Sequence, residues 1–129
     1  MSDYGMRTLF DGDIAAAETA ITEALKEVGF GILTRIDVAE TLKNKIDVER
    51  APYVILGACN PKLANNALNL EPELGLMLPC NVIIYQNDNE ETVVSIIDPQ
   101  AMVGMIDNPT LDCLVKDARP LLEQALNSI

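Results

Sequence analysis

Residues 53–61 read YVILGACNP, and this stretch decides how the rest of the chain is interpreted. Its first part, 53–58, is almost wholly apolar, which predicts a strand with both faces covered. Asn60 is a favourable helix N-cap and Pro61 a favourable first helical residue, so the strand should lead through Cys59 directly into a helix. The apolar side of that helix is expected to come from four residues, Leu63, Ala64, Ala67 and Leu68.

A second segment, Leu78-Pro79-Cys80-Asn81, introduces the next strand, residues 81–86. A cluster of turn residues at 87–91 separates it from another apolar strand at 92–97. The connection is too short for a crossover, so these two strands should form an antiparallel hairpin.

The N-terminal half predicts two further pairs of elements. Residues 6–10 suit a first strand, and a helix follows Asp13, its expected cap, as far as Gly29. In the strand at 30–36, simple alternation places four residues on one face: Phe30, Ile32, Thr34 and Ile36. A short helix capped by Asp37 is expected to turn three residues inward: Val38, Leu42 and Ile46.

The C-terminal third predicts helices. Asp98-Pro99 begins a short helix to residue 106 that has no polar face and is therefore expected to be buried or at a subunit interface. An apolar stripe then runs from Leu111 to Ile129. Because the stripe keeps its phase across Pro120, we expect a kinked helix or two helices meeting there.

The order of elements alone does not decide between parallel and antiparallel strands. Cys59 ends one strand and Cys80 begins the next. These two positions lie at the same end of the sheet only if the strands are antiparallel. If the cysteines form one site, the fold is α+β: a two-layer sandwich of a mostly antiparallel sheet with helices on one face.

Length and charge limit the functional classes. The 129 residues suit a single domain, 1–129, and the net charge of −11 opposes binding to nucleic acid or to an anionic membrane surface. The N-terminus does not have the pattern of a signal peptide, and no apolar run approaches the ~20 residues that span a bilayer. We therefore expect a cytoplasmic protein, in which an odd count of three cysteines does not suggest a disulfide framework.

The segments Glu27–Phe30, Tyr53–Pro61 and Leu78–Val82, with Glu71-Pro72 between the last two, resemble the bacterial and archaeal domain-of-unknown-function family numbered 302. The resemblance covers nearly the whole chain. It implies a two-layer α+β fold similar to one lobe of a TATA-binding protein, often a homodimer, and no established biochemical activity. Pro120 departs from the uninterrupted last helix that is usual in the family.

Cys59, Cys80 and Glu71 form the candidate catalytic group, with Asn60 and Asn81 as candidate pocket residues. A thiolate at Cys59 is favoured by the following helix N-terminus, and Glu71 is a possible proton acceptor. The alternative is that both cysteines are small buried residues and that Glu71 caps a backbone N–H.

Other chemistry has less support. The chain has no His, which excludes the usual serine triad and Cys-His catalysis and weakens any metal site. No Gly-rich phosphate loop is present, and the sequence specifies no cofactor.

Two functional hypotheses remain. The first is a thiol-containing ligand-binding or redox domain centred on Cys59 and Cys80, with a small-molecule ligand. The second is a non-catalytic homodimeric interaction module with structural cysteines, whose interface includes the helix at 101–106.

Overall fold

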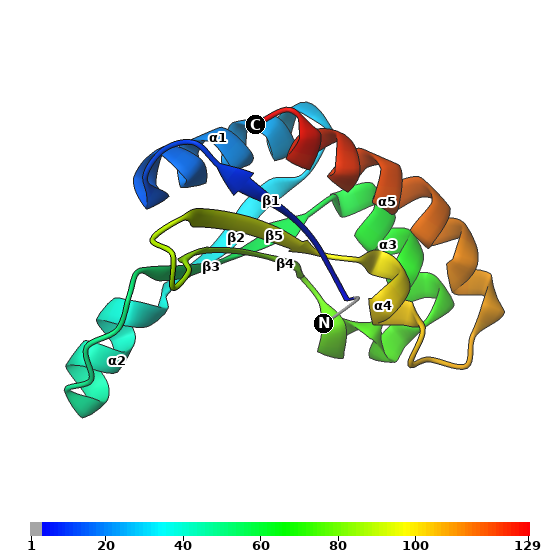
Figure 1. Ribbon diagram of the computed structural model, residues 1–129. Coiled ribbons are helices and arrows are strands. Elements are labelled where there is room, and N and C mark those ends of the chain that lie inside the picture. Colours follow the sequence, from blue (N-terminus) through cyan, green and yellow to red (C-terminus); the bar gives the residue numbers. More distant parts are fainter. Residues whose placement is uncertain (1–3) are drawn as a thin grey trace.

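The computed structural model describes residues 4–129 and shows one five-stranded antiparallel sheet with helices packed against it (Figure 1). The spatial order of the strands is β1-β5-β4-β3-β2. This arrangement confirms the expected α+β class with an antiparallel sheet. The strands are β1 (Gly5–Phe10), β2 (Gly31–Asp37), β3 (Tyr53–Cys59), β4 (Cys80–Gln86) and β5 (Thr92–Ile97).

Two long helices, α1 and α5, cover one face of the sheet, while α3 and α4 lie at one end of it (Figure 1). The helices are α1 (Ile14–Glu27), α2 (Val38–Ile46), α3 (Pro61–Leu70), α4 (Pro99–Val103) and α5 (Asp112–Asn127), with short 3-10 helices η1 (Pro72–Met77) and η2 (Pro109–Leu111). The main core is formed where α1 and α5 meet the sheet, around Ile21, Leu56, Ile84, Ile96 and Leu122.

Local sequence explains where the main helices begin. The side chain of Asp13 accepts a hydrogen bond from the backbone N–H of Ala16 at 2.8 Å, which satisfies one free donor at the start of α1. Gly29 follows the helix with a φ of 89°, a conformation that glycine adopts without strain. The expected caps at both ends of this helix are confirmed.

Strands β3 and β4 are antiparallel, as the argument from the two cysteines required. The register places Ala58 opposite Cys80 and Gly57 opposite Asn81. The predicted hairpin of β4 and β5 is also confirmed, with Ile84 opposite Val94.

In the strand at 30–36, the predicted orientation of the side chains is wrong for Thr34 and Ile36, which follow the bulge. A β-bulge lies between Ile32 and Thr34, so Ile32 pairs with Ala58 but Thr34 pairs with Gly57. A bulge adds one residue to a strand and reverses the alternation after it. Ile36 therefore lies on the face opposite to the main core, and Arg35 takes the core side, where it binds Glu18 of α1 at 2.7 Å.

The second face of the sheet, which we call the open face, has no helix packed across it among residues 4–129 (Figure 1). The expectation that the strand at 53–58 is covered on both faces is therefore wrong. Tyr53 and Tyr85 lie on this face, stacked with ring centroids 5.5 Å apart. Both rings are half-buried, and the guanidinium of Arg50 lies 5.5 Å from the centroid of the Tyr53 ring.

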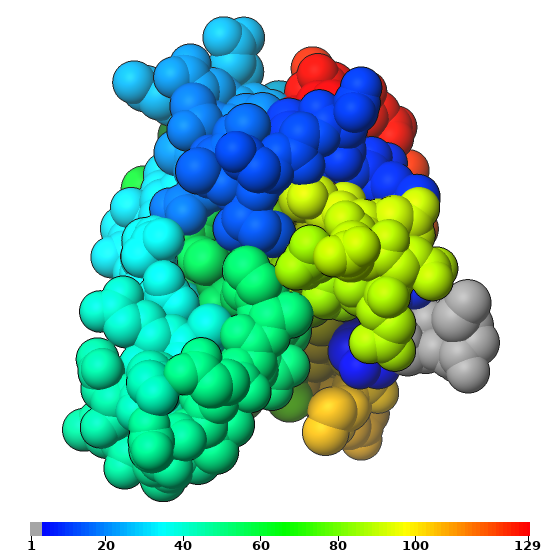
Figure 2. Space-filling view, turned by 60° about the vertical axis from the view of Figure 1, so that its left-hand side comes forward, coloured from blue at the N-terminus to red at the C-terminus, as the bar shows by residue number. Residues whose placement is uncertain are grey.

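Helix α2 stands out from the body as a lobe at one corner (Figure 2). None of its residues is buried, and Ile46 is 63% exposed, so the predicted inward turn of this helix is wrong at Ile46. The helix is held by its Asp37 cap, which accepts from the N–H of Glu40, and by an ion pair between Lys43 and Asp47.

The C-terminal stripe forms a single helix, α5, with Pro120 inside it. Pro120 is exposed, and the buried residues of α5 lie on both sides of it, including Leu114 and Leu122. Of the two alternatives predicted, the two-helix one is therefore wrong.

No helix within residues 4–129 is both long and apolar enough to cross a membrane. Residues 1–3 of the N-terminal stretch discussed above lie outside the described part of the chain.

Candidate functional site

An apolar cavity of about 250 Å³ lies between the end of the sheet and the layer formed by α3, α4 and α5. Its wall is almost entirely carbon and sulfur. The lining residues come from six regions: Phe30 before β2; Ala58, Cys59 and Asn60 at the end of β3; Leu63, Ala64 and Ala67 on α3; Leu74, Leu78, Pro79 and Cys80 from η1 to the start of β4; Pro99, Met102 and Val103 on α4; and Leu114, Val115 and Ala118 on α5.

The cavity lies at the seam between two hydrophobic clusters. Phe30 and Ala58 belong to the main core, while Leu74 and Leu114 belong to a smaller core formed by α3, η1, η2 and the start of α5. Four alanines line the seam where larger side chains would close it: Ala58, Ala64, Ala67 and Ala118. The space is partly open to solvent, and larger side chains at these four positions would fill it.

Both candidate cysteines line this cavity. Cys59 ends β3 and Cys80 begins β4, but the register pairs Cys80 with Ala58, so the two cysteines are offset by one residue. Both are half-buried and unbonded. The antiparallel sheet thus brings the two thiols to one site without placing them directly opposite each other.

The environment of Cys80 favours the neutral thiol. Burial among apolar groups, together with the electrostatic effect of the nearby Cys59, raises the pKa of Cys80 to about 11. A thiol with this pKa carries its proton at neutral pH and is a poor nucleophile.

The two candidate asparagines lie in different places. Asn60 lines the cavity and caps α3, its Oδ1 accepting from the N–H of Leu63 at 3.2 Å. Asn81 is exposed on the open face, one residue after Cys80. It borders a separate groove there instead of the cavity.

Glu71 does not line the cavity that both cysteines line. It follows the last residue of α3, whereas Cys59 precedes the first, and a helix of this length is about 15 Å long. The Glu71 carboxylate accepts a hydrogen bond from the amide Nδ2 of Asn108 at 3.1 Å. The same amide donates to the carbonyl of Leu70, so this cluster ties the end of α3 to the segment before η2.

Cys113 is exposed, and its Sγ donates to the carbonyl of Thr110 at 3.1 Å. It lies outside the cavity wall. Within residues 4–129, no cluster of three or more His, Cys, Asp or Glu side chains is arranged to hold a metal ion.

Sequence reasoning found the cysteines and Asn60 but missed most of the wall, notably Met102, Pro99 and the alanines. A signal was present: two inward positions of the helix at 61–70, Ala64 and Ala67, carry alanine where a filled core would carry a larger side chain. Small residues at several inward positions indicate either close helix packing or a void, and only the placement of the elements distinguishes the two.

The fold and the cavity define a small α+β protein that has an antiparallel sheet with one open face and an apolar cavity at the strand ends. The chain belongs to the family described as Domain of unknown function DUF302, whose model matches residues 6–129. It is similar to a solved structure described as an uncharacterized conserved protein DUF302 from Bacillus stearothermophilus. The two chains are 29% identical, each is covered to 98%, and the TM-score is 0.91. No curated protein matches the chain.

Proposed function

We propose that the protein is a binding domain for a small apolar molecule, with the thiols of Cys59 and Cys80 in the wall of its site. The observation that carries this proposal is the cavity of about 250 Å³ with two thiols and almost no other polar surface. A smaller engineered cavity of about 150 Å³ with apolar walls already binds benzene.

Ligand binding is better supported than thiol redox chemistry. Redox-active cysteines are usually thiolates in electropositive, partly exposed positions. Cys80 is in the opposite situation, because burial in an apolar wall raises its pKa and favours the neutral thiol. Glu71 accepts from Asn108 at the far end of α3 and does not line the cavity that both thiols line, which favours binding over base-assisted thiol chemistry.

The expected affinity follows from the area removed from water. Each buried methylene contributes about 0.8 kcal/mol, so a six-carbon alcohol gains roughly 4 to 5 kcal/mol. This corresponds to a Kd on the order of 1 mM. Isothermal titration calorimetry with 1-hexanol tests the proposal.

Filling the cavity provides the variant. Ala64 lies in the wall, so Ala64→Phe should abolish hexanol binding while leaving the protein folded, because the added ring enters existing space. Ala15→Phe, at an exposed position of α1, is the matched control and should bind as the wild type does. Equal hexanol binding by wild type and Ala64→Phe would contradict the proposal. Ala118→Phe, on the opposite wall, provides a second test if Ala64→Phe does not fold.

We propose as a second function that the protein is a homodimeric interaction module, with the open face against a second copy. The observation in favour is the apolar character of that face. Ile55 and Ile83 are half-buried in its centre, and Leu9 and Ile36 at its sides are 57% and 48% exposed. An exposed apolar surface of this extent is typical of an interaction site.

The size of the face suits a second copy. Five strands about 4.8 Å apart and about 20 Å long present a face of roughly 500 Å². Stable interfaces bury about 800 Å² per partner. The exposed apolar residues beside the sheet, Ile46 and Val48 on one side and Met105 on the other, extend the surface toward that value.

Sedimentation equilibrium tests the dimer. Ile36→Lys or Met105→Asp should shift the protein to monomer, because each places a charge in the proposed interface. Leu68→Lys is the control, since Leu68 is exposed on α3 away from the open face. A wild-type protein that stays monomeric at high micromolar concentration would exclude this second function.

A further inference from the structure

We infer that the ligand is an unbranched amphiphile, with an alkyl chain in the cavity and an uncharged polar end in a groove on the open face. This inference rests on the proposed ligand-binding function and adds the shape and chemistry of the ligand.

The groove lies directly behind the cavity wall and has a volume of about 350 Å³. Two residues, Pro79 and Met102, line both spaces and therefore form the partition between them. A single apolar chain that passes this partition can occupy both spaces at once. A compact or branched molecule can occupy only one.

The partition is built from a movable side chain. Met102 is half-buried on α4, and methionine has three rotatable bonds and adapts to irregular spaces. The N-terminal end of α4 is held, because Asp98 caps it and binds Arg119 of α5 at 3.3 Å. Beyond the other end of α4, Met105 is 80% exposed. Rotation of Met102 therefore opens a passage without unfolding the helix.

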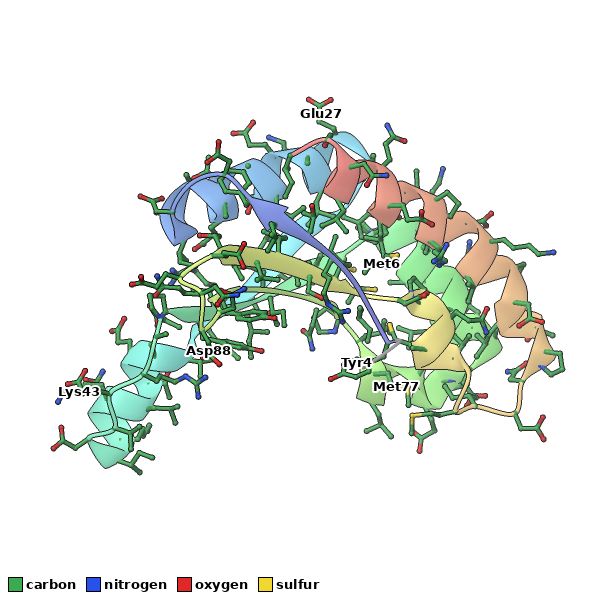
Figure 3. All side chains as sticks on the ribbon, viewed as in Figure 1. Tyr4, Met6, Glu27, Lys43, Met77 and Asp88 are labelled. Carbon is green, nitrogen blue, oxygen red and sulfur yellow. The ribbon has the colours of Figure 1, made fainter. Side chains whose placement is uncertain are left out.

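The groove supplies the polar groups that the cavity lacks. Tyr4 and Asn81 border it, and Figure 3 shows Tyr4 beside Met77 under the sheet. The phenol and the amide are neutral and able to form hydrogen bonds. Among residues 4–129, no charged side chain lines the groove, and the protein has a net charge of −11. A neutral hydroxyl or amide end thus fits this position better than a carboxylate.

The volume of the cavity determines how long an alkyl chain must be before it has to extend into the groove. At about 30 Å³ per water-sized group, the cavity alone holds on the order of eight groups. An eight-carbon alcohol should fill it, and longer chains gain affinity only if they extend into the groove.

The experiment is a titration of the full chain with 1-hexanol, 1-octanol, 1-decanol and 1-dodecanol. If the chain passes the partition, affinity should rise about fourfold for each added methylene through dodecanol. Decanoate should bind at least tenfold more weakly than decanol. A plateau after octanol would overturn this inference and leave the proposed function intact. Absence of binding by every alcohol would overturn both.

Two variants locate the distal end of the chain. Asn81→Phe fills the groove at an exposed strand position and should weaken dodecanol binding at least tenfold while leaving hexanol binding unchanged. Asn66→Phe makes the same change at an exposed position of α3 outside both spaces. Equal dodecanol affinity in the two variants would contradict the placement of the polar end.

Discussion

Gly57 shows how one residue fixes the position of the cavity wall. It lies in β3, and a Cβ at this position would lie 2.6 Å from Cγ of Pro79 and closer still to Oγ1 of Thr34. Pro79 belongs to the partition between cavity and groove. The absence of a side chain at residue 57 therefore lets Pro79 rest against the sheet.

We predict that Gly57→Ala lowers the free energy of unfolding by about 1 to 3 kcal/mol, the usual cost of overpacking. Urea denaturation measures it. Gly31→Ala is the matched control, because a Cβ at that position meets no atom within 4 Å, and its effect should stay within about 0.5 kcal/mol. If the two changes lowered the free energy of unfolding equally, crowding of a Cβ against Pro79 and Thr34 would not be the cause.

The buried thiol of Cys80 makes the stability of the protein depend on pH. An unfolded thiol loses its proton near pH 8.5, whereas the folded Cys80 keeps its proton up to a pKa of about 11. Between these values the unfolded state binds fewer protons, so stability falls as pH rises. Below the lower value, the contribution of Cys80 to stability is fully present.

We predict that the free energy of unfolding declines between about pH 8.5 and 11, with a Cys80 contribution of about 3 kcal/mol. Cys80→Ala removes this part of the decline, and Cys113→Ala, at an exposed cysteine, retains it. Urea denaturation at several pH values measures the slopes. Parallel curves for wild type and Cys80→Ala would rule out the assigned role of Cys80.

At the scale of elements, α3 is the structural wall of the cavity, and its start depends on Asn60. The Asn60 side chain accepts from Leu63 N–H, and Pro61 begins the helix without a donor to satisfy. The far end is tied to Asn108 through Leu70 and Glu71. Both ends of the wall are therefore anchored by side-chain amides.

We predict that Asn60→Ala costs about 1 kcal/mol of stability through loss of the cap, and that Asn60→Asp restores most of it. The Asp variant should still bind hexanol more weakly than wild type, because it places a charge in the cavity wall. Thermal unfolding and calorimetry measure the two effects. The exposed Asn65→Ala serves as the control, and a loss of stability as large as that of Asn60→Ala would contradict the capping role.

Most elements were predictable from the sequence because caps, turns and apolar periodicity are local. The antiparallel pairing of β3 and β4 followed from a single assumption about Cys59 and Cys80. Three features were not predictable: the bulge after Ile32, the exposure of Ile46, and the open face behind Tyr53. Each depends on which apolar surface finds a partner in three dimensions, which the local pattern does not contain. Only one side of the cavity was predictable, for the same reason. The two thiols were recognisable in the sequence, but the opposite wall comes from α4 and α5, which are distant in sequence.

At the scale of the whole molecule, the net charge of −11 acts against self-association. Two copies with their open faces together bring two strongly acidic bodies into contact. Salt screens this repulsion, with a Debye length of about 10 Å at 0.1 M and about 3 Å at 1 M.

We therefore predict that the proposed dimer tightens as salt rises from 0.02 to about 0.5 M. Sedimentation equilibrium across the series measures the Kd of the dimer. Dissociation by salt would instead indicate an interface held by ion pairs, contrary to the apolar open face.

The central claim is that Cys80 lies in the wall of a ligand-binding cavity, and alkylation of the native protein tests it most directly. The labelling rates of Cys80 and Cys113 are measured by peptide mass at pH 9.5, with and without saturating 1-octanol. We predict that octanol slows labelling of Cys80 severalfold and leaves the exposed Cys113 unchanged. An unchanged rate at Cys80 under saturating octanol would contradict the claim.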